Sequence, residues 1–317
     1  MSLKSNSEEF SNMSKTKLIV VAGPTASGKT ALAIELARRL SGEIISADSM
    51  QVYKGMSVAT AAPTQDELEA APHHLVEFLD KSESYSVSDF CDLAREKIDE
   101  ITARGKLPII AGGTGLFIDS LVDNIIFTPA KADAELRTRL LEKSGEELYE
   151  ELLSVDREAA LKIHKNNKTR VARALEIYYS SGETKTQQNI NSRKEESPYD
   201  VLYFVIGYRD RALLYDRINR RVDIMLENGL LDEARENQNR LGTAAQAIGH
   251  KELAPYFDGS LSLDEAVDKL KQETRHYAKR QITWFKRRQG AVWLYADELG
   301  NALADETEKI SGEFLNG

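Results

Sequence analysis

A segment near the start of the chain has the residue types and spacing of a phosphate-binding loop. Residues 23–30 are GPTASGKT, which fits the pattern G-x-x-x-x-G-K-[ST], and they lie between an apolar, β-branched run and a helical pattern. In such a loop, backbone N–H groups and the positive end of the helix dipole bind an anion, and the lysine adds a full charge. The threonine hydroxyl can ligate a phosphate-bound Mg²⁺. The predicted phosphate-binding residues are Gly23, Thr25, Ala26, Ser27, Gly28, Lys29 and Thr30, with Thr30 as the predicted Mg²⁺ ligand. A turn that is glycine-rich by chance is the alternative.

Asp48 is a candidate for acid–base chemistry near this loop. It follows a strand pattern at residues 43–47, whereas a third strand pattern, at residues 106–111, runs into GGTG. In nucleotide hydrolases a later strand ends in an aspartate that supports Mg²⁺, and that carboxylate is missing here. Because the carboxyl ends of parallel strands meet at one edge of a sheet, Asp48 is expected near the loop. It can act in chemistry there or cap the next turn, and the pattern leaves both open.

A segment near the C-terminus combines basic and aromatic side chains. Residues 271–288, KQETRHYAKRQITWFKRR, contain a single acid in a chain whose net charge is −9. Basic residues such as Arg275 and Lys279 can follow phosphates, and exposed aromatic rings can stack on unpaired bases. The alternative is an amphipathic helix whose aromatic residues belong to the core and whose charges face solvent. A second basic stretch at residues 164–173 favours RNA binding.

The elements that must position these residues predict an α/β fold with a P-loop-type parallel sheet flanked by helices. Strand patterns at residues 18–22, 43–47, 106–111 and 201–206 are separated by helical stretches, as in parallel sheets with right-handed crossovers. Helical patterns without strands fill the region between the last two. We therefore predict a tail at residues 1–16, a core at 17–127 and 200–317, and a helical insertion at 128–199. The C-terminal part is expected to be helical, with breaks at Pro255 and Gly259.

Composition limits the class of protein. The chain has 317 residues, of which 41% are hydrophobic and 29% charged, which is typical of a globular protein. No apolar run approaches the roughly 20 residues that cross a bilayer, and the polar N-terminus does not resemble a secretory signal. A lone Cys91 and five histidines without ligand spacing make a zinc site improbable. We expect a cytoplasmic monomer that binds no membrane.

Taken together, these segments resemble the tRNA dimethylallyltransferase (tRNA isopentenyltransferase) family from about residue 18 to about residue 293. The matching stretches are GPTASGKT (23–30), SADSMQVYKGM (46–56), PHHL (72–75), YSVSDF (85–90), PIIAGGTGLF (108–117), RVARALEIY (170–178), DRINRRVDIMLENGLLDE (216–233), QAIGHKEL (246–253) and YAKRQITWF (277–285). Their joint order and spacing, rather than any one of them, carries the resemblance.

The resemblance implies transfer of the dimethylallyl group from dimethylallyl diphosphate to N6 of the tRNA adenosine on the 3′ side of the anticodon, position 37, with release of pyrophosphate. It implies that Asp48 is the general base and that Thr114 holds the base or phosphate in line. Arg217 is expected to join the P-loop in binding the pyrophosphate, although Arg220 and Arg221 are close enough in sequence to serve instead. Mg²⁺ at Thr30 is the implied cofactor.

The implied partner is the anticodon stem-loop of tRNA, gripped by the core and by the insertion. The residues that the resemblance assigns to this contact are Asp48, Ser49, Met50, Gln51, Thr114, Arg170, Arg173, Gln246, Lys251, Arg275, Lys279 and Arg280. The chain departs from the family pattern at residues 167–169, at His250 and at Phe117, where the family usually has other residues. These departures concern tRNA contacts rather than the phosphate or proton-transfer chemistry.

Three other interpretations share part of this pattern. A small-molecule kinase would have the P-loop, the parallel sheet and a lid-like insertion, but the basic aromatic helix would be unexplained. An adenylate isopentenyltransferase of the cytokinin type would act on free nucleotides and would be shorter at the C-terminal end. An RNA-binding adaptor with a decayed P-loop would not need intact Lys29, Thr30 and Asp48.

Overall fold

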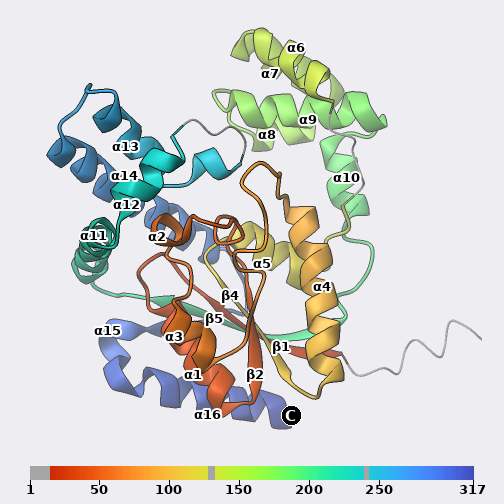
Figure 1. Cartoon of the computed structure of the whole chain (residues 1–317). Helices are drawn as coiled ribbons and strands as arrows, with labels where there is room; N and C mark the ends of the chain where they lie inside the picture. The colour runs from red at the N-terminus through yellow and green to blue at the C-terminus, as the bar shows by residue number, and fades with distance from the viewer. Residues whose placement is uncertain (1–14, 128–132, 239–242) are drawn as a thin grey trace, which may run out of the picture. The chain divides into compact units, whose positions relative to one another are not determined.

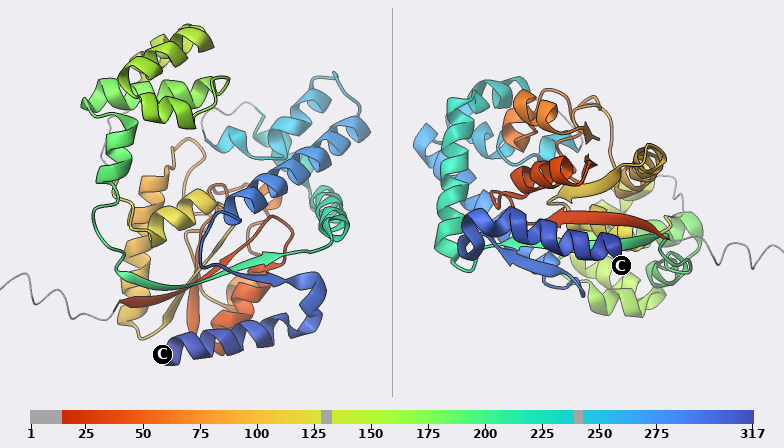
Figure 2. Two further views of the ribbon diagram at one scale, coloured as in Figure 1. Left: turned by 180° about the vertical axis from the view of Figure 1, so that it is seen from behind. Right: turned by 90° about the horizontal axis from the view of Figure 1, so that it is seen from below.

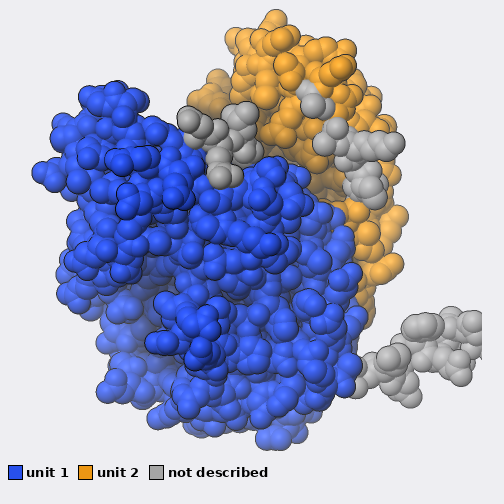
Figure 3. All heavy atoms as spheres, viewed as in Figure 1, with its two compact units in different colours: residues 1–122, 198–317 blue, residues 123–197 orange. Residues whose placement is uncertain are grey.

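The computed structural model describes residues 15–127, 133–238 and 243–317, and the chain forms two compact units. Unit 1 holds the residues up to Val122 and from Pro198 onward, and unit 2 is Asp123–Ser197; Figure 3 shows them in blue and orange. The tail predicted at residues 1–16 falls, except for its last two residues, outside the described residues. The first strand already begins at Thr16.

Unit 1 is built on a six-stranded sheet in which every pair of neighbouring strands is parallel, which confirms the predicted α/β class. The strand order is β3-β2-β4-β1-β5-β6. The strands are β1 Thr16–Ala22, β2 Gly42–Ser46, β3 His73–His74, β4 Leu107–Gly112, β5 Tyr199–Gly207 and β6 Val292–Tyr295. The two strands without a sequence prediction, β3 and β6, are the short strands at the two edges.

The apolar runs form strands because both faces of the sheet are covered. From Leu18 to Ala22, β1 is completely buried, and its β-branched side chains suit a pleated strand packed on both sides. Ile19 and Val21 pack with Leu36 of α1 on one face. Burying one such side chain stabilises the fold by about 1.5–3 kcal/mol, so this run anchors the centre of the sheet.

Helices form layers around the sheet (Figures 1 and 2). On one face α1 lies beside α16 in all views, and Arg39 of α1 forms ion pairs of 2.7 Å with Asp305 and Glu308 of α16. Helices α4 and α5 contact each other and β4. The helices of unit 1 are α1 Lys29–Arg39, α2 Ser57–Thr60, α3 Gln65–Ala70, α4 Val87–Ala103, α5 Gly115–Val122, α11 Arg211–Glu227, α12 Leu230–Glu236, α13 His250–Phe257, α14 Leu263–Phe285, α15 Ala296–Leu299 and α16 Leu303–Asn316, with 3₁₀ turns Ala244–Gln246 and Gly300–Ala302.

Unit 2 has its own core. Its helices are α6 Ala134–Glu142, α7 Gly145–Val155, α8 Arg157–Lys162, α9 Lys168–Ser181 and α10 Lys185–Asn191. Leu148, Leu152 and Leu175 are fully buried in one apolar cluster. The buried Asp156 accepts hydrogen bonds from the backbone N–H of Ala159 and from the backbone and hydroxyl of Thr186, which fastens α8 to α10.

The GGTG segment at the end of β4 is closely packed against the Ala47 carbonyl and against α14. A side chain on Gly112 would bring its Cβ to 2.2 Å from the Ala47 carbonyl oxygen, and one on Gly115 would bring it to 2.2 Å from Trp284 of α14. Glycine is therefore required at both positions because other atoms already occupy the space of a Cβ. This close packing lets α14 lie directly on the carboxyl edge of the sheet.

The structure corrects one detail expected for the C-terminal part and decides between the two alternatives left open for its aromatic residues. Pro255 lies inside α13 rather than breaking it, and the chain turns instead at Gly259, whose φ of 79° suits glycine. The aromatic residues near the end of α14 are not exposed platforms for bases. Phe285 is fully buried, and the indole N–H of Trp284 donates to Asp119 at 2.6 Å. Across the described residues, no helix combines the length and apolar character needed to span a membrane.

Gln281 joins α14 to the P-loop, so its loss should destabilise unit 1. Its Oε1 accepts from the Thr25 backbone N–H at 2.9 Å, and its Nε2 donates to the Gly113 carbonyl at 3.0 Å. Gln281→Leu leaves the buried Gly113 carbonyl and the partly buried Thr25 N–H unpaired, at about 1–3 kcal/mol for each buried group. We expect urea unfolding to show a loss of about 2–4 kcal/mol. Gln272→Leu, the same change at an exposed position of α14, should stay within about 0.5 kcal/mol, and equal losses would contradict the bridging role.

Candidate phosphate-binding cavity

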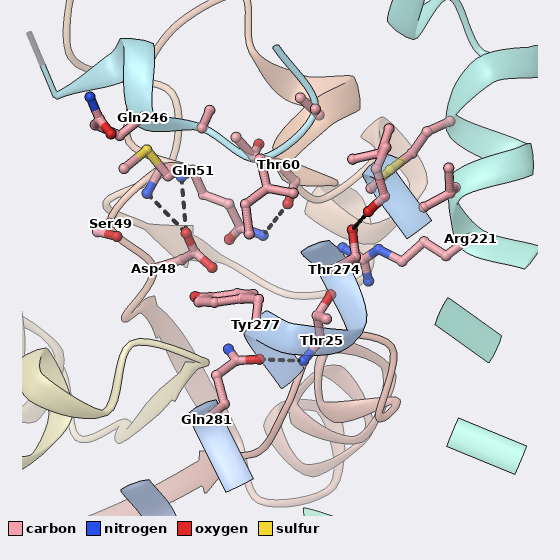
Figure 4. Close-up of a pocket in the computed structure, with 18 of the residues that line it drawn as sticks. Thr25, Asp48, Ser49, Gln51, Thr60, Arg221, Gln246, Thr274, Tyr277 and Gln281 are labelled. Atoms are coloured by element: carbon pink, nitrogen blue, oxygen red, sulfur yellow. Dashed lines mark hydrogen bonds between the residues drawn. The ribbon is translucent and has the colours of Figure 1, made fainter. Parts of the chain in front are cut away.

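A cavity of about 280 Å³ opens beside the P-loop in unit 1. It is formed by the P-loop, the segment after β2, helices α2, α11 and α14, and the chain around the start of α13, and Figure 4 shows it. The residues that line it are Thr25, Lys29, Thr30, Asp48, Ser49, Met50, Gln51, Ala59, Thr60, Arg221, Val222, Met225, Gln246, Ala247, Ile248, Gly249, Lys251, Leu270, Thr274, Tyr277, Arg280 and Gln281.

The P-loop turns sharply between β1 and α1, and its backbone geometry explains its glycines. Gly28 caps α1 with a φ of 91°, and a Cβ on Gly23 would lie 2.7 Å from the Ile206 carbonyl oxygen. No acidic residue occupies the first turn of α1, so the positive end of the helix dipole is not offset there. Of the seven predicted phosphate-binding residues, Thr25, Lys29 and Thr30 line the cavity. Gly23, Ala26, Ser27 and Gly28 form the turn that presents them.

Two cations, Lys29 and Arg221, share one wall of the cavity. Burial and the positive charge of Arg221 lower the pKa of Lys29 to about 8, against a smaller opposing effect of Asp48. Burial also lowers the pKa of Arg221. The Nε of Arg221 is buried and has no hydrogen-bond partner within the described part of the chain. Like charges held together with unused donors make a site that favours a polyanion.

The three arginines that the sequence offered for the pyrophosphate lie differently with respect to the cavity. Arg221 lines the cavity, whereas Arg217 does not and is largely exposed. Arg217 donates from Nε to the Ala26 carbonyl at 2.9 Å, so it holds the P-loop turn from outside the cavity. Arg220, the third arginine of this cluster, is also exposed and does not line the cavity. Arg217 lies one helical turn before Arg221 on α11, so it meets the P-loop turn at Ala26 while Arg221 lines the cavity.

The geometry of Asp48 is compatible with both roles that its sequence left open. One carboxylate oxygen, Oδ1, accepts from the backbone N–H of Met50 at 2.9 Å and of Gln51 at 3.4 Å, which fixes the turn after β2. The other oxygen makes no hydrogen bond to a described residue and faces the cavity (Figure 4). A carboxylate with one oxygen anchored and one available has the geometry of a positioned base.

Tyr277 and Thr114 lie beside Asp48. Burial and the nearby Asp48 carboxylate raise the pKa of Tyr277 far above its ordinary value, and a smaller effect of the Thr114 side chain lowers it. The phenol therefore stays protonated. The Thr114 hydroxyl accepts from the Ser49 backbone N–H at 3.2 Å. Thr114 therefore sits behind the lining of the cavity and orients residues that form it.

A chain of hydrogen bonds stiffens the wall formed by Gln51 and α2. The Gln51 amide donates to the carbonyl oxygens of Thr60 and Ala61 and accepts from the Ser46 hydroxyl. Glu233 accepts from the backbone N–H groups of Val58 and Ala59, at the start of α2, and lies 3.0 Å from His250. Burial raises the pKa of Glu233, but these hydrogen bonds outweigh the effect of burial and hold the pKa below its ordinary value. His250, a departure from the family pattern, thus has a structural partner here.

The structure places the residues expected to bind tRNA in different surroundings: some line the cavity, and others lie outside it. Ser49, Met50, Gln51, Gln246, Lys251 and Arg280 line the cavity with Asp48. Lys279 is exposed on α14 outside the lining, and Arg275 donates to Asn219 at 2.6 Å. Arg170 and Arg173 are exposed on α9 in unit 2, one turn apart, and Arg173 lies 2.9 Å from Glu176.

Sequence reasoning did not assign the polar face of α14. Thr274, Tyr277 and Gln281 line the cavity at spacings of three and four residues, which is one face of a helix. The sequence signal for this face was the presence of polar residues at helical spacing among apolar ones. An apolar wall of the cavity was also not assigned, and it consists of Ala59, Val222, Met225, Ala247, Ile248 and Leu270.

Comparison with known proteins gives a consistent result. The family model described as IPP transferase matches residues 51–288. The chain is 47% identical to a tRNA dimethylallyltransferase of Acetivibrio thermocellus, over 92% of this chain and 94% of that protein. It is similar to the crystal structure of the full-length tRNA isopentenylpyrophosphate transferase of Bacillus halodurans, with 41% identity, a TM-score of 0.72, and coverage of 95% and 97%. It is also similar to a eukaryotic dimethylallyltransferase acting on tRNA, with 31% identity, a TM-score of 0.83, and coverage of 95% and 80%.

The pKa of Lys29 predicts how diphosphate binding depends on pH. A lowered pKa of about 8 means that Lys29 loses its charge as the pH rises through 8, and the charged form is the one that binds an anion. We expect the dissociation constant of an alkyl diphosphate, measured by calorimetry, to be level up to about pH 8 and then to rise about tenfold per pH unit. Lys29→Arg keeps its charge and should give a flat profile. A flat profile for the unaltered protein would contradict this assignment.

Proposed function

The chain belongs to the tRNA dimethylallyltransferase family and catalyses the reaction of that family, and we propose that the cavity beside the P-loop is where this reaction takes place. The dimethylallyl group is transferred to N6 of adenosine 37 of tRNA, next to the anticodon. The bond between C1 of the prenyl group and the diphosphate oxygen breaks, the bond between C1 and N6 forms, and pyrophosphate leaves.

The observation that carries this proposal is the division of the cavity into a cationic and an apolar wall. Lys29 and Arg221 stand at the P-loop end, and Val222, Met225 and Leu270 contribute to an apolar wall. Dimethylallyl diphosphate has the same division, with a multiply charged head and a five-carbon hydrocarbon tail. A kinase transfers a phosphoryl group and has no need of an apolar wall beside the phosphates.

We assign proton transfer to Asp48 and charge neutralisation to Lys29 and Arg221. An exocyclic amine on an aromatic ring is a weak nucleophile, so removal of its proton helps as the bond to C1 forms. The unbonded oxygen of Asp48 can accept that proton. The leaving diphosphate develops charge, which the two cations and the backbone N–H groups of the P-loop stabilise. Arg217 acts indirectly in this scheme, by holding the P-loop through the Ala26 carbonyl.

The residues present suit Mg²⁺ as the cofactor. Among the described residues no group of three His, Cys, Asp or Glu side chains could hold a metal by itself, so the ion must depend on its substrate for ligands. The Thr30 hydroxyl and the Asp48 carboxylate both line the cavity, and hard oxygen ligands are what Mg²⁺ prefers. We propose Thr30 as the ligand from the protein, with Asp48 close by. When bound, the ion neutralises charge on the diphosphate.

We further propose that both units contact tRNA. The exposed Arg170 and Arg173 of α9 support a phosphate contact by unit 2, and the exposed Lys279 and Arg280 support one by α14. Adenosine 37 must leave the base stack to reach the cavity, which costs a few kcal/mol and calls for a broad basic surface. We propose that the chain acts on tRNA as a monomer in the cytoplasm, where its substrate is found.

A transfer assay tests the proposal and the role of Asp48 together. Purified protein, Mg²⁺ and labelled dimethylallyl diphosphate are mixed with unmodified tRNA, with AMP or with ATP. Label should appear in tRNA and not in AMP. Asp48→Asn should bind both substrates but slow transfer about 10²-fold to 10⁴-fold, because the amide cannot accept the proton. Asp66→Asn, an exposed carboxylate on α3, is the control and should be unaffected.

Each negative outcome of this assay is informative. Label in AMP alone would indicate a cytokinin-type enzyme, and ATP turnover without transfer would indicate a kinase. A near-normal rate for Asp48→Asn would remove Asp48 from proton transfer and leave it as a cap of the turn after β2.

The exposed position of Lys279 predicts an electrostatic contribution to tRNA binding. Lys279→Ala should weaken binding of tRNA and reduce the slope of log affinity against log salt concentration by about 1, while binding of dimethylallyl diphosphate is unchanged. Lys309→Ala, an exposed lysine of α16, is the control. An unchanged slope for Lys279→Ala would indicate that this end of α14 is only a solvated surface.

A further inference from the structure

A second, much smaller cavity lies behind the P-loop, in the place where many P-loop proteins have a carboxylate. In P-loop hydrolases a later strand ends in an aspartate that supports Mg²⁺. Here β4, which pairs with β1, ends at Ala111 and Gly112 and carries no carboxylate there. Gly112 cannot carry a side chain because its Cβ would meet the Ala47 carbonyl at 2.2 Å. The supporting group must therefore come from another strand.

His73 on the edge strand β3 contributes to the lining of this cavity. β3 pairs with β2 through Ile44 and His73, and His73 lines the small cavity together with Thr30, Ser46 and Asp48. Its Nδ1 lies 2.8 Å from the Ala71 carbonyl oxygen, which can only accept, so Nδ1 carries the hydrogen. In the neutral ring Nε2 is then an acceptor.

The Nε2 atom of His73 is buried and has no hydrogen-bond partner in the described parts of the chain. An unpaired buried polar atom costs about 1–3 kcal/mol, and such atoms in folded proteins are commonly satisfied by ordered water. Burial lowers the pKa of His73, which favours the neutral ring with a lone pair on Nε2. His73 therefore presents a fixed acceptor to the cavity.

The cavity has the size and polarity of a site for one water molecule. Its volume is about 20 Å³, whereas seating one water requires roughly 10–15 Å³. Besides His73, its polar lining consists of Lys29, Thr30, Ser46, Asp48 and Gln51. A water that donates to Nε2 of His73 and to Asp48 keeps its oxygen lone pairs for a cation, which can be the Lys29 ammonium or a bound Mg²⁺.

We propose that this cavity holds one ordered water fixed by His73 and Asp48, and that His73 acts through this water as a positioning residue for Mg²⁺ bound with the diphosphate. The proposal rests on the proposed function, since it concerns the same diphosphate site. In this scheme, the imidazole of His73 on β3 takes the place of the strand-end carboxylate that β4 lacks.

Metal binding tests this role without the transfer reaction. The protein is saturated with dimethylallyl diphosphate in the absence of tRNA, and Mg²⁺ is titrated by calorimetry, with Mn²⁺ monitored by electron paramagnetic resonance as a second readout. His73→Leu removes the acceptor and should weaken Mg²⁺ binding about 10-fold to 100-fold, the range found for partners of metal-bound groups. His73→Gln restores an acceptor near Nε2 and should recover most of that affinity.

The neighbouring histidine supplies a matched control. His74 bonds through Nε2 to Glu43 at 2.7 Å and does not line the cavity. His74→Gln should therefore leave Mg²⁺ affinity unchanged. Equal Mg²⁺ affinity in His73→Leu and the unaltered protein would overturn the role of His73 and leave the proposed function standing. Failure of the unaltered protein to bind Mg²⁺ with the diphosphate would instead contradict the proposed function.

A crystal structure of the unaltered protein keeps the inference testable if His73→Leu does not fold. A water within hydrogen-bond distance of His73 Nε2, about 2.7–3.2 Å, is expected in the small cavity. An Nε2 bonded to a protein group, or a dry cavity, would overturn the proposal.

Discussion

Unit 1 depends on keeping two cations together at the carboxyl edge of the sheet. Lys29 and Arg221 come from different helices, and their charges oppose each other in a partly desolvated cavity, as the lowered pKa of Lys29 shows. Such an arrangement costs folding free energy until an anion is bound. The surrounding contacts offset that cost: the P-loop is held by Arg217 through Ala26 and by Gln281 through Thr25. The cationic wall is thus preorganised by neighbouring residues that do not themselves need to touch the substrate.

Helix α14 serves both the fold and the site, which explains its unusual composition. One face carries Phe285 and Trp284 into the interior, a second presents Tyr277 and Gln281 to the cavity and the P-loop, and a third leaves Lys279 to solvent. The helix α14 is therefore neither only a structural helix nor only a candidate RNA-binding helix. Its aromatic residues serve packing, while part of its charge remains available for a polyanion. The glycines of GGTG are needed because α14 lies so close to the loop after β4.

The polar groups beside the P-loop come from other strands than the one that carries the aspartate in P-loop hydrolases. β4 ends in small residues that make room for α14 and for the Ala47 carbonyl, and the polar groups come from β2 and β3 instead. Asp48 is thereby left with one oxygen free of hydrogen bonds to the described residues. In a transferase whose acceptor is a weakly nucleophilic amine, such a carboxylate is more useful as a base than as a permanent metal ligand.

The sequence alone determined the elements and chemistry that depend on local pattern. The P-loop and the parallel α/β sheet follow from residue types and spacing, because a glycine-rich loop between strand and helix has few other uses. The same pattern left Asp48 open between chemistry and capping. Tertiary structure decided what depends on side-chain direction across distant segments. Arg217 and Arg221 are one helical turn apart, and only the packing of α11 shows that Arg221 faces the cavity. Likewise, the Thr25 partner of Gln281 is 256 positions away in the chain, and β3 is only two residues long. Neither the Gln281 bridge nor the buried, unpaired nitrogen of His73 therefore has a local signal in the sequence.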